Sequence, residues 1–301
     1  QKAQAYKMSL RLILSNPTLL FRHVAILLIC SIVFFLPLRG HAQQENARAL
    51  VQTIVNNELE ADANDHSRWM FRDANKVHGE STVKLVVQTG EGDLSKTIEI
   101  NGHPLTLQQQ KADELKMHRF VTDSAVRQKQ KRNQQHDDKQ AASMTRMLPD
   151  AFLWTKTDEN GYETTLAFKP DPKFNPPTRQ ARVFAAMEGT MVVNAKQKRI
   201  KSLKGTLTRN VNFGFGLLGK LEKGGTFNVE RQNIGSDVWE ITVTHIHIHG
   251  HALIFKSIDE QQDEETNDYK PAPHSITLAE AEKMLNDGTV ARQLGVEQPR
   301  P

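Results

Sequence analysis

The chain has 301 residues, with 39 Lys and Arg, 35 Asp and Glu, and a single cysteine. Residues 1–42 hold five of the basic residues and no acidic residue, so the remainder carries 34 basic against 35 acidic residues. A nearly neutral remainder lacks the basic field that nucleic-acid binding requires, and the lone Cys30 excludes a disulfide within the chain.

Residues 1–42 have the pattern of a secretory leader. Basic residues at Lys7, Arg11 and Arg22 precede an apolar run over 24–36, and Gly40-His41-Ala42 presents small residues where a signal peptidase cleaves. The run is about 15 residues long, shorter than the ~20 of a spanning helix. We therefore expect cleavage after Ala42 and a periplasmic location, with an uncleaved membrane anchor as the alternative.

The pattern beyond the leader predicts an amphipathic helix over 45–64, because Ala49, Leu50, Thr53, Ile54 and Leu59 recur at helical spacing. From Ser67 the apolar period changes to two, and turn residues separate short stretches, which predicts antiparallel strands up to Gly102.

A polar excursion is expected over 106–148. Thr106 followed by Gln109 resembles a capping box, which predicts a helix that begins there. Residues 127–140 contain almost no apolar side chain, so they form either a solvated helix or a mobile segment.

After Pro149 the sequence again predicts strands, divided by turns at Asn160-Gly161, Gly189, Gly224-Gly225, Gly235 and His249-Gly250. Residues 259–301 are expected to be an acidic linker and a tail whose last helix covers Leu278 to Asn286. The sequence thus predicts one α+β domain over 43–258, in which helices cover one face of a large, curved, mainly antiparallel sheet.

This order of elements resembles the LolA/LolB class of periplasmic lipoprotein carriers. The local likeness lies in Met187–Asn194 followed by Lys198-Arg199-Ile200, which is similar to the paired strands of that class. The resemblance implies an unclosed half-barrel whose apolar hollow holds acyl chains, but no motif transfers a family binding residue. The chain also looks like an uncharacterised family of secreted bacterial proteins.

Four alternating histidines in the run 244–251 are the strongest candidate for chemistry. Residues two apart on a strand share a face, so His245 and His247 are candidate ligands for a transition metal. If His249-Gly250 forms a turn, this pair continues the apolar face of Trp239, Ile241 and Val243. Polar strand residues near a cavity rim are the alternative interpretation.

The segment Gly214–Gly219 matches G-x-G-x-x-G literally, but its setting favours an apolar loop over a dinucleotide site. Such a loop, carrying Phe213, Phe215, Leu217 and Leu218, would cover a lipid cavity or enter a membrane surface. Its alternative is a loop tucked into the core. No nucleophile elbow, metalloprotease motif or thiol follows the leader, so we expect no enzyme and no cofactor.

The sequence therefore predicts a non-enzymatic envelope protein that binds a lipid, or the acyl part of a lipoprotein, in an apolar hollow. The candidate lining is Met187, Met191, Phe213, Phe215, Leu217, Leu218, Trp239, Ile241 and Val243. A structural scaffold without a ligand and a metal-binding protein that uses His245 and His247 are the two alternatives.

Overall fold

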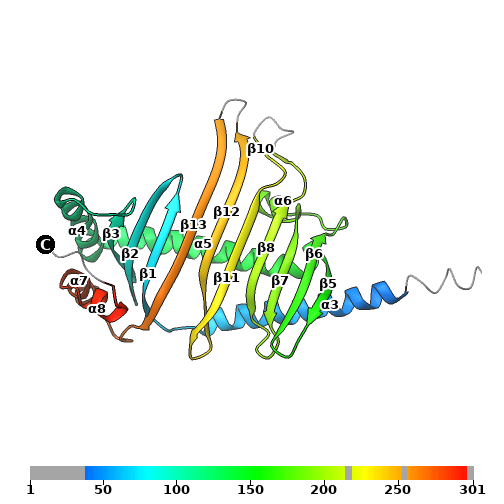
Figure 1. Cartoon of the computed structure of the whole chain (residues 1–301), viewed down its shortest axis with the longest axis horizontal. Coiled ribbons are helices and arrows are strands. Elements are labelled where there is room, and N and C mark those ends of the chain that lie inside the picture. The colour runs from blue at the N-terminus through cyan, green and yellow to red at the C-terminus, as the bar shows by residue number, and fades with distance from the viewer. Residues whose placement is uncertain (1–37, 214–218, 253–255, 297–301) are drawn as a thin grey trace, which may run out of the picture. The chain divides into compact units, whose positions relative to one another are not determined.

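The structure is a computed structural model that describes residues 38–213, 219–252 and 256–296 (Figure 1). The chain divides into two compact units, 1–46 and 47–301, and the arrangement below is that of the second unit. The described helices are α3 (Leu38–Asn64), α4 (Leu107–Thr122), α5 (Ser124–Ala151), α6 (Arg179–Phe184), α7 (Leu278–Asn286) and α8 (Thr289–Leu294).

Thirteen strands form one antiparallel sheet in the described ranges. They are β1 (Trp69–Val77), β2 (Glu80–Thr89), β3 (Gly92–Ile100), β4 (His103–Pro104), β5 (Phe152–Glu159), β6 (Glu163–Pro170), β7 (Met187–Asn194), β8 (Ile200–Leu207), β9 (Val211–Phe213), β10 (Gly219–Leu221), β11 (Thr226–Gly235), β12 (Val238–Ala252) and β13 (Lys256–Pro271). Their order is β4-β3-β2-β1-β13-β12-β11-β8-β7-β6-β5, and β9 and β10 attach beside β12. The edge strands β4 and β5 do not pair, so the sheet is open and the expected α+β half-barrel class is confirmed.

Two separate hydrophobic cores lie at the two ends of the sheet. The first packs α3 and the end of α5 against β5–β8, around the fully buried Trp154, Leu166 and Met191. The second packs α4, α7 and α8 against β1–β3, around Leu85 and Leu285.

The strand register places the two cores on opposite faces of the sheet. Cross-strand partners share a face, and the pairs Met191–Leu203, Leu203–Val229, Val229–Thr244, Thr244–Glu264 and Glu264–Asn75 trace one face across the sheet. This face carries the first core at β7, whereas Met70 and Leu85 of the second core lie on the other face of β1 and β2. Between the cores the first face bears Leu203 and Val229 on β8 and β11, and polar side chains from Thr244 of β12 to Asn75 of β1.

Glycines allow strands β7, β8 and β11 to approach closely. Gly189 pairs with Gly205, and Gly205 pairs with Phe227. A Cβ atom on Gly205 would lie 2.4 Å from the Phe227 ring, so a larger residue would displace that ring. The ring packs against the first core.

Helix α5 spans the middle of the sheet. Its first residues follow α4, its last residues precede β5, and Figure 1 shows it crossing behind the strands between these ends. Residues 128–141 are all exposed, on every side of the helix, and only Leu148, Pro149 and Ala151 near its end are buried. The polar excursion is therefore a solvated helix, one of the two forms expected.

Several sequence expectations are confirmed and others are corrected. The capping box of Thr106 and Gln109 is present, and the helix expected over Leu278 to Asn286 is α7, but it is not the last helix, because α8 follows it. Neither Gly189 nor His249-Gly250 is a turn, because Gly189 lies within β7 and β12 continues to Ala252. The acidic stretch 259–268 is not a linker, since it lies within β13, the strand between β1 and β12.

Candidate functional site

A cavity of about 1050 Å³ lies between the middle of the sheet and the helices α3 and α5. Strand residues from β8, β11 and β12 form one wall. The helix α5 contributes Gln134, Asp138, Ala141 and Thr145, whose spacing of four, three and four residues defines one helix face. Its volume lies at the upper end of the range for ligand sites, ~300–1,000 Å³.

The sheet wall of the cavity is largely apolar. Leu203 and Val229 are cross-strand partners, so they share the face that looks into the cavity. Ile241 continues this wall on β12, and 47% of its surface is exposed. Ile200 and Leu148 join the apolar wall to the first core.

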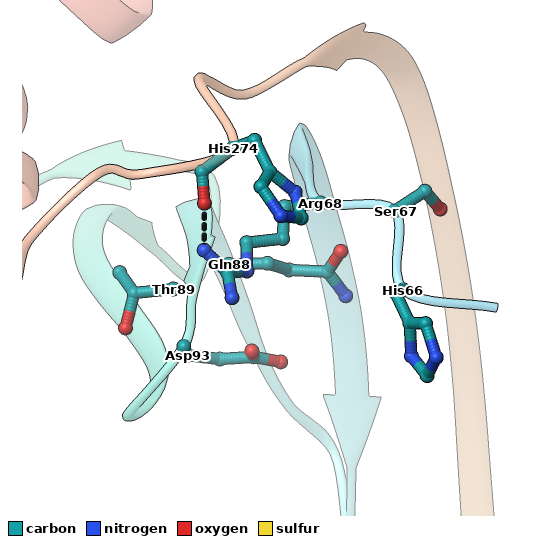
Figure 2. A pocket seen from close by; sticks show the side chains of 8 residues that line it. His66, Ser67, Arg68, Gln88, Thr89, Asp93 and His274 are labelled. Carbon is teal, nitrogen blue, oxygen red and sulfur yellow. Dashed lines mark hydrogen bonds between the residues drawn. The ribbon is translucent and has the colours of Figure 1, made fainter.

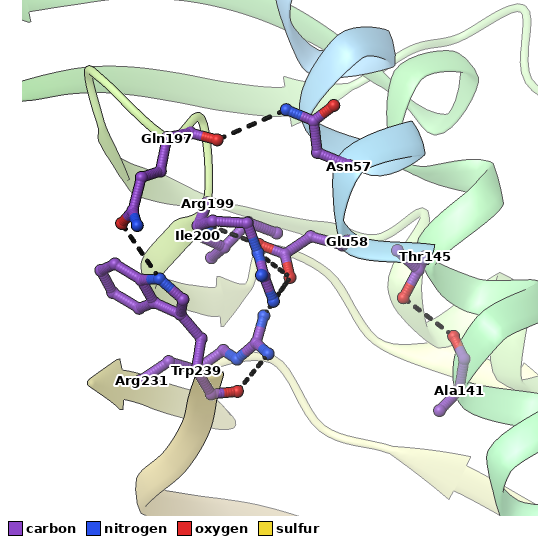
Figure 3. Close-up of polar contacts among 9 residues, drawn as sticks. All are labelled: Asn57, Glu58, Ala141, Thr145, Gln197, Arg199, Ile200, Arg231 and Trp239. Atoms are coloured by element: carbon purple, nitrogen blue, oxygen red, sulfur yellow. Dashed lines mark hydrogen bonds and ion pairs between the residues drawn. The ribbon is translucent and has the colours of Figure 1, made fainter. Parts of the chain in front are cut away.

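A buried ion-pair network closes one end of the cavity (Figure 3). Glu58 of α3 accepts hydrogen bonds from the Arg199 Nε atom at 3.0 Å and from the backbone N–H of Ile200 at 2.6 Å. Arg231 also contacts the same carboxylate, and its second nitrogen donates to the Trp239 carbonyl at 2.6 Å. The side chain of Glu58 is only 4% exposed, so its charge is stabilised by these partners rather than by water.

Further acidic side chains line the same cavity. Burial raises the pKa of Asp62, against the lowering effect of Arg231, and the nearby carboxylates of Glu58 and Asp65 raise it further. Burial likewise raises the pKa of Glu240. The Arg231 guanidinium lowers this pKa, whereas the carboxylates of Asp65 and Asp62 raise it. Burial is the largest cause of both shifts, and the cavity lining itself contains six acidic side chains against two arginines.

The structure brings some of the sequence-predicted lining residues to the cavity and places others elsewhere. Trp239 and Ile241 line it. Met187 and Met191 lie inside the packed first core, and Phe213 packs against that core, so these three form no part of the cavity wall. Phe215, Leu217 and Leu218 lie outside the described residues.

A β-bulge moves Val243 and the histidines to the opposite face from Trp239 and Ile241. Glu230 pairs with Val243 but Arg231 pairs with Ile241, so Thr242 is an extra residue in β12. The expectation that His245 and His247 continue the face of Trp239 and Ile241 is therefore corrected. The two histidines lie on the face away from the cavity, with Val243.

Both predicted metal ligands bind one carboxylate. His245 Nδ1 and His247 Nε2 each lie 2.8 Å from Asp263 Oδ1. Burial favours a higher pKa for Asp263, but hydrogen bonds from His247 and His245 outweigh it, and the pKa is lowered. In the described part of the chain, no group of three or more His, Cys, Asp or Glu side chains is placed to hold a metal ion.

The glycine-rich segment lies between two short antiparallel strands. β9 ends at Phe213 and β10 begins at Gly219, and these two residues are paired. A strand rather than a helix therefore follows the motif, which lacks the strand–helix setting of a dinucleotide site. Residues 214–218 themselves are outside the described ranges.

A second hollow of about 580 Å³ lies beside the start of β1 (Figure 2). His66, His274 and Asp93 line it, and Arg68 donates to the backbone carbonyl of His274. Burial raises the pKa of Asp93. The described hydrogen bonds link none of the three to another as a nucleophile–base pair would be linked.

The Glu58 network was missed at the sequence level. The helical pattern over 45–64 is predicted from Ala49, Leu50, Thr53, Ile54 and Leu59. Of these, only Ile54 belongs to the buried face, which consists of Ala47, Val51, Ile54, Val55 and Glu58. Glu58 stands four residues after Ile54, on the same face, and this spacing is the signal that could have found it.

Comparisons with protein-family models, curated proteins and solved structures find no match for this chain. The resemblance to the LolA/LolB class thus stays a prediction. Among the described residues, no helix combines the length and the hydropathy needed to cross a membrane.

Proposed function

We propose that this protein is a non-enzymatic binding protein that holds the apolar chain of a lipid or of an acylated peptide in the cavity beneath α5. The observation that carries the proposal is the apolar wall of Leu203, Val229 and Ile241 in a cavity of about 1050 Å³. The periplasmic location is proposed with it, on the basis of the leader pattern alone.

The energetics of such binding rest on apolar burial. Each methylene removed from water contributes ~0.8 kcal/mol, so ten methylenes contribute roughly 8 kcal/mol. Several kcal/mol of lost ligand freedom oppose this gain. The result is reversible binding, which suits a carrier that must also release its ligand.

The solvated middle of α5 provides a route for the ligand. Because residues 128–141 are exposed on every side of the helix, no packed core has to be disrupted when this segment moves away from the sheet. Entry and release can then take place beside α5 while both hydrophobic cores stay intact.

Binding of an uncharged probe tests the proposal. The protein is expressed with its own leader, purified without a histidine tag, and analysed by native mass spectrometry and organic extraction for bound lipid. Isothermal titration with dodecyl maltoside, below its micelle concentration, then measures occupancy of the emptied cavity. Near-unit stoichiometry is expected.

A pair of matched variants locates the binding. Ile241→Asp places a carboxylate in the apolar wall, and because Ile241 is half exposed, the packed cores are untouched. We expect binding at least roughly tenfold weaker, since an unpaired charge costs more than ~1.4 kcal/mol there. Leu107→Asp, at a 77% exposed residue of α4, is the control and should bind as the wild type does. Absence of bound lipid together with no probe binding would favour the scaffold alternative.

A further inference from the structure

The charge of the cavity constrains the head group of its ligand. Six acidic residues and two basic ones line it: Glu58, Asp62, Asp65, Asp138, Asp237, Glu240, Arg199 and Arg231. Glu58 binds both arginines, and Arg231 also interacts with Asp62, so these four side chains balance one another.

Three carboxylates at the cavity, Asp65, Asp138 and Asp237, have no such counterpart in the described ranges, and Glu240 shares Arg231 with Glu58 and Asp62. Asp65 accepts from the backbone N–H of Ser67 at 2.8 Å, and Asp138 accepts from the Gln134 side chain at 2.8 Å, which are both neutral donors. Within the described ranges, no lysine or arginine forms an ion pair with Asp65, Asp138 or Glu240. Asp65, which directly follows α3, and Glu240 of β12 both line the cavity, and the carboxylate of Asp65 raises the pKa of Glu240.

From this charge distribution we infer that the cavity selects an amphiphile with a positively charged nitrogen, a primary or quaternary ammonium group, over one with an anionic head. The apolar chain lies against Leu203, Val229 and Ile241, and the ammonium group lies near Asp65 and Glu240. An ammonium group relieves the repulsion among these carboxylates, whereas a carboxylate or phosphate head adds to it. The inference rests on the proposed function and specifies its ligand.

Three probes with the same twelve-carbon chain test the inference: dodecylammonium, dodecyl maltoside and laurate. At pH 7 and low ionic strength we expect dodecylammonium to bind at least tenfold more tightly than laurate, with the maltoside between them. The preference should shrink as salt is raised, because screening weakens the charge interactions.

Two sets of variants tie the preference to the acidic side chains. Asp65→Asn combined with Glu240→Gln should remove most of the preference for dodecylammonium over laurate. Asp137→Asn changes an exposed carboxylate of α5 next to Asp138 but outside the cavity lining, and it should keep the preference. Ile241→Asp should weaken binding of the maltoside, which separates specific binding from adsorption of a cationic detergent.

The outcomes separate the two claims. If all three probes bind with equal affinity, or if laurate binds most tightly, the head-group inference is overturned while the proposed function stands. If none of the probes binds, the proposed function fails, and the inference fails with it.

Discussion

At the scale of single residues, Glu58 links the first core to the cavity. Its carboxylate accepts hydrogen bonds from Arg199, from Arg231 and from the backbone of Ile200, so it joins α3 to β8 and β11. Arg199 is only 11% exposed at its side chain, so it would be left as a buried cation without its carboxylate.

Glu58→Ala should therefore destabilise the protein strongly. We expect the free energy of unfolding to fall by ~3–5 kcal/mol, the range for removal of one partner of a buried ion pair. Urea denaturation measures the loss, and Glu60→Ala, at an exposed position of the same helix, is the control with an expected change within about 0.5 kcal/mol. A loss below about 1 kcal/mol for Glu58→Ala would mean that water replaces the carboxylate and that the network is not buried.

One residue also explains why the histidines were assigned to the wrong face. Strict alternation along β12 places Ile241, Val243 and His245 together, and the sequence contains no sign of an extra residue. Thr242 forms the bulge because β11 pairs around it, with Glu230 opposite Val243 and Arg231 opposite Ile241. Such a bulge depends on a neighbouring strand, so periodicity within one strand cannot reveal it.

At the scale of elements, α5 is a helix without a hydrophobic stripe over its middle. A helix that is polar all round is stabilised by its ends and by local pairs rather than by packing. Both kinds of support are present: Arg127 donates to the Phe120 and Val121 carbonyls near the start, and Leu148 is buried in the first core near the end.

Hydrogen exchange should show this uneven support. We expect the amides of residues 128–141 to exchange roughly a hundredfold faster than those of β8, because local opening there breaks no tertiary contact. Amides near Leu148 in the same helix should be protected like the strands, which provides an internal control. Equal protection along the whole of α5 would contradict the solvated state of its middle and the entry route proposed beside it.

The strand β13 shows the limit of composition as a guide to elements. Its stretch 259–268 is so acidic that it resembles a linker, yet β13 pairs with β1 and β12 over most of its length. The strand lies between the two cores, where the sheet has little apolar cover on either face, so apolar alternation is absent. The elements at the two cores could be predicted from the sequence because they do alternate.

At the scale of the whole molecule, the order of helices and strands predicted the open antiparallel sheet, but its division into two cores could not be predicted. That division follows from pairing β1 with β13, strands almost two hundred residues apart. It leaves buried polar groups between the cores, including Asp73 Oδ1 and Asn75 Oδ1, which have no described hydrogen-bond partner. Burial raises the pKa of Asp73. Burial also raises the pKa of Glu264, and the nearby carboxylate of Asp73 raises it further.

These buried carboxylates predict how stability depends on pH. Folding raises the pKa of such a carboxyl group, so the group holds its proton more tightly in the folded state than in the unfolded state. The difference appears at pH values above the ordinary pKa, which is 4.5 for Glu264. The stabilising contribution of its protonation is therefore complete below that value and is lost as the pH rises through the raised pKa.

Glu264→Gln removes one of these groups and isolates its effect. At pH 7 we expect the variant to be more stable than the wild type, because the wild type must keep a charge in a desolvated place. The difference should shrink as the pH falls through the raised pKa of Glu264, because the wild-type carboxyl then becomes protonated. Urea denaturation of both proteins between pH 5 and pH 7.5 measures this difference, and histidine protonation, which affects both proteins alike, cancels from it. Glu265→Gln, on the opposite face of β13, should show no such pH-dependent gain. A difference independent of pH would show that Glu264 is hydrated, and that water fills the polar middle of the sheet beneath α5.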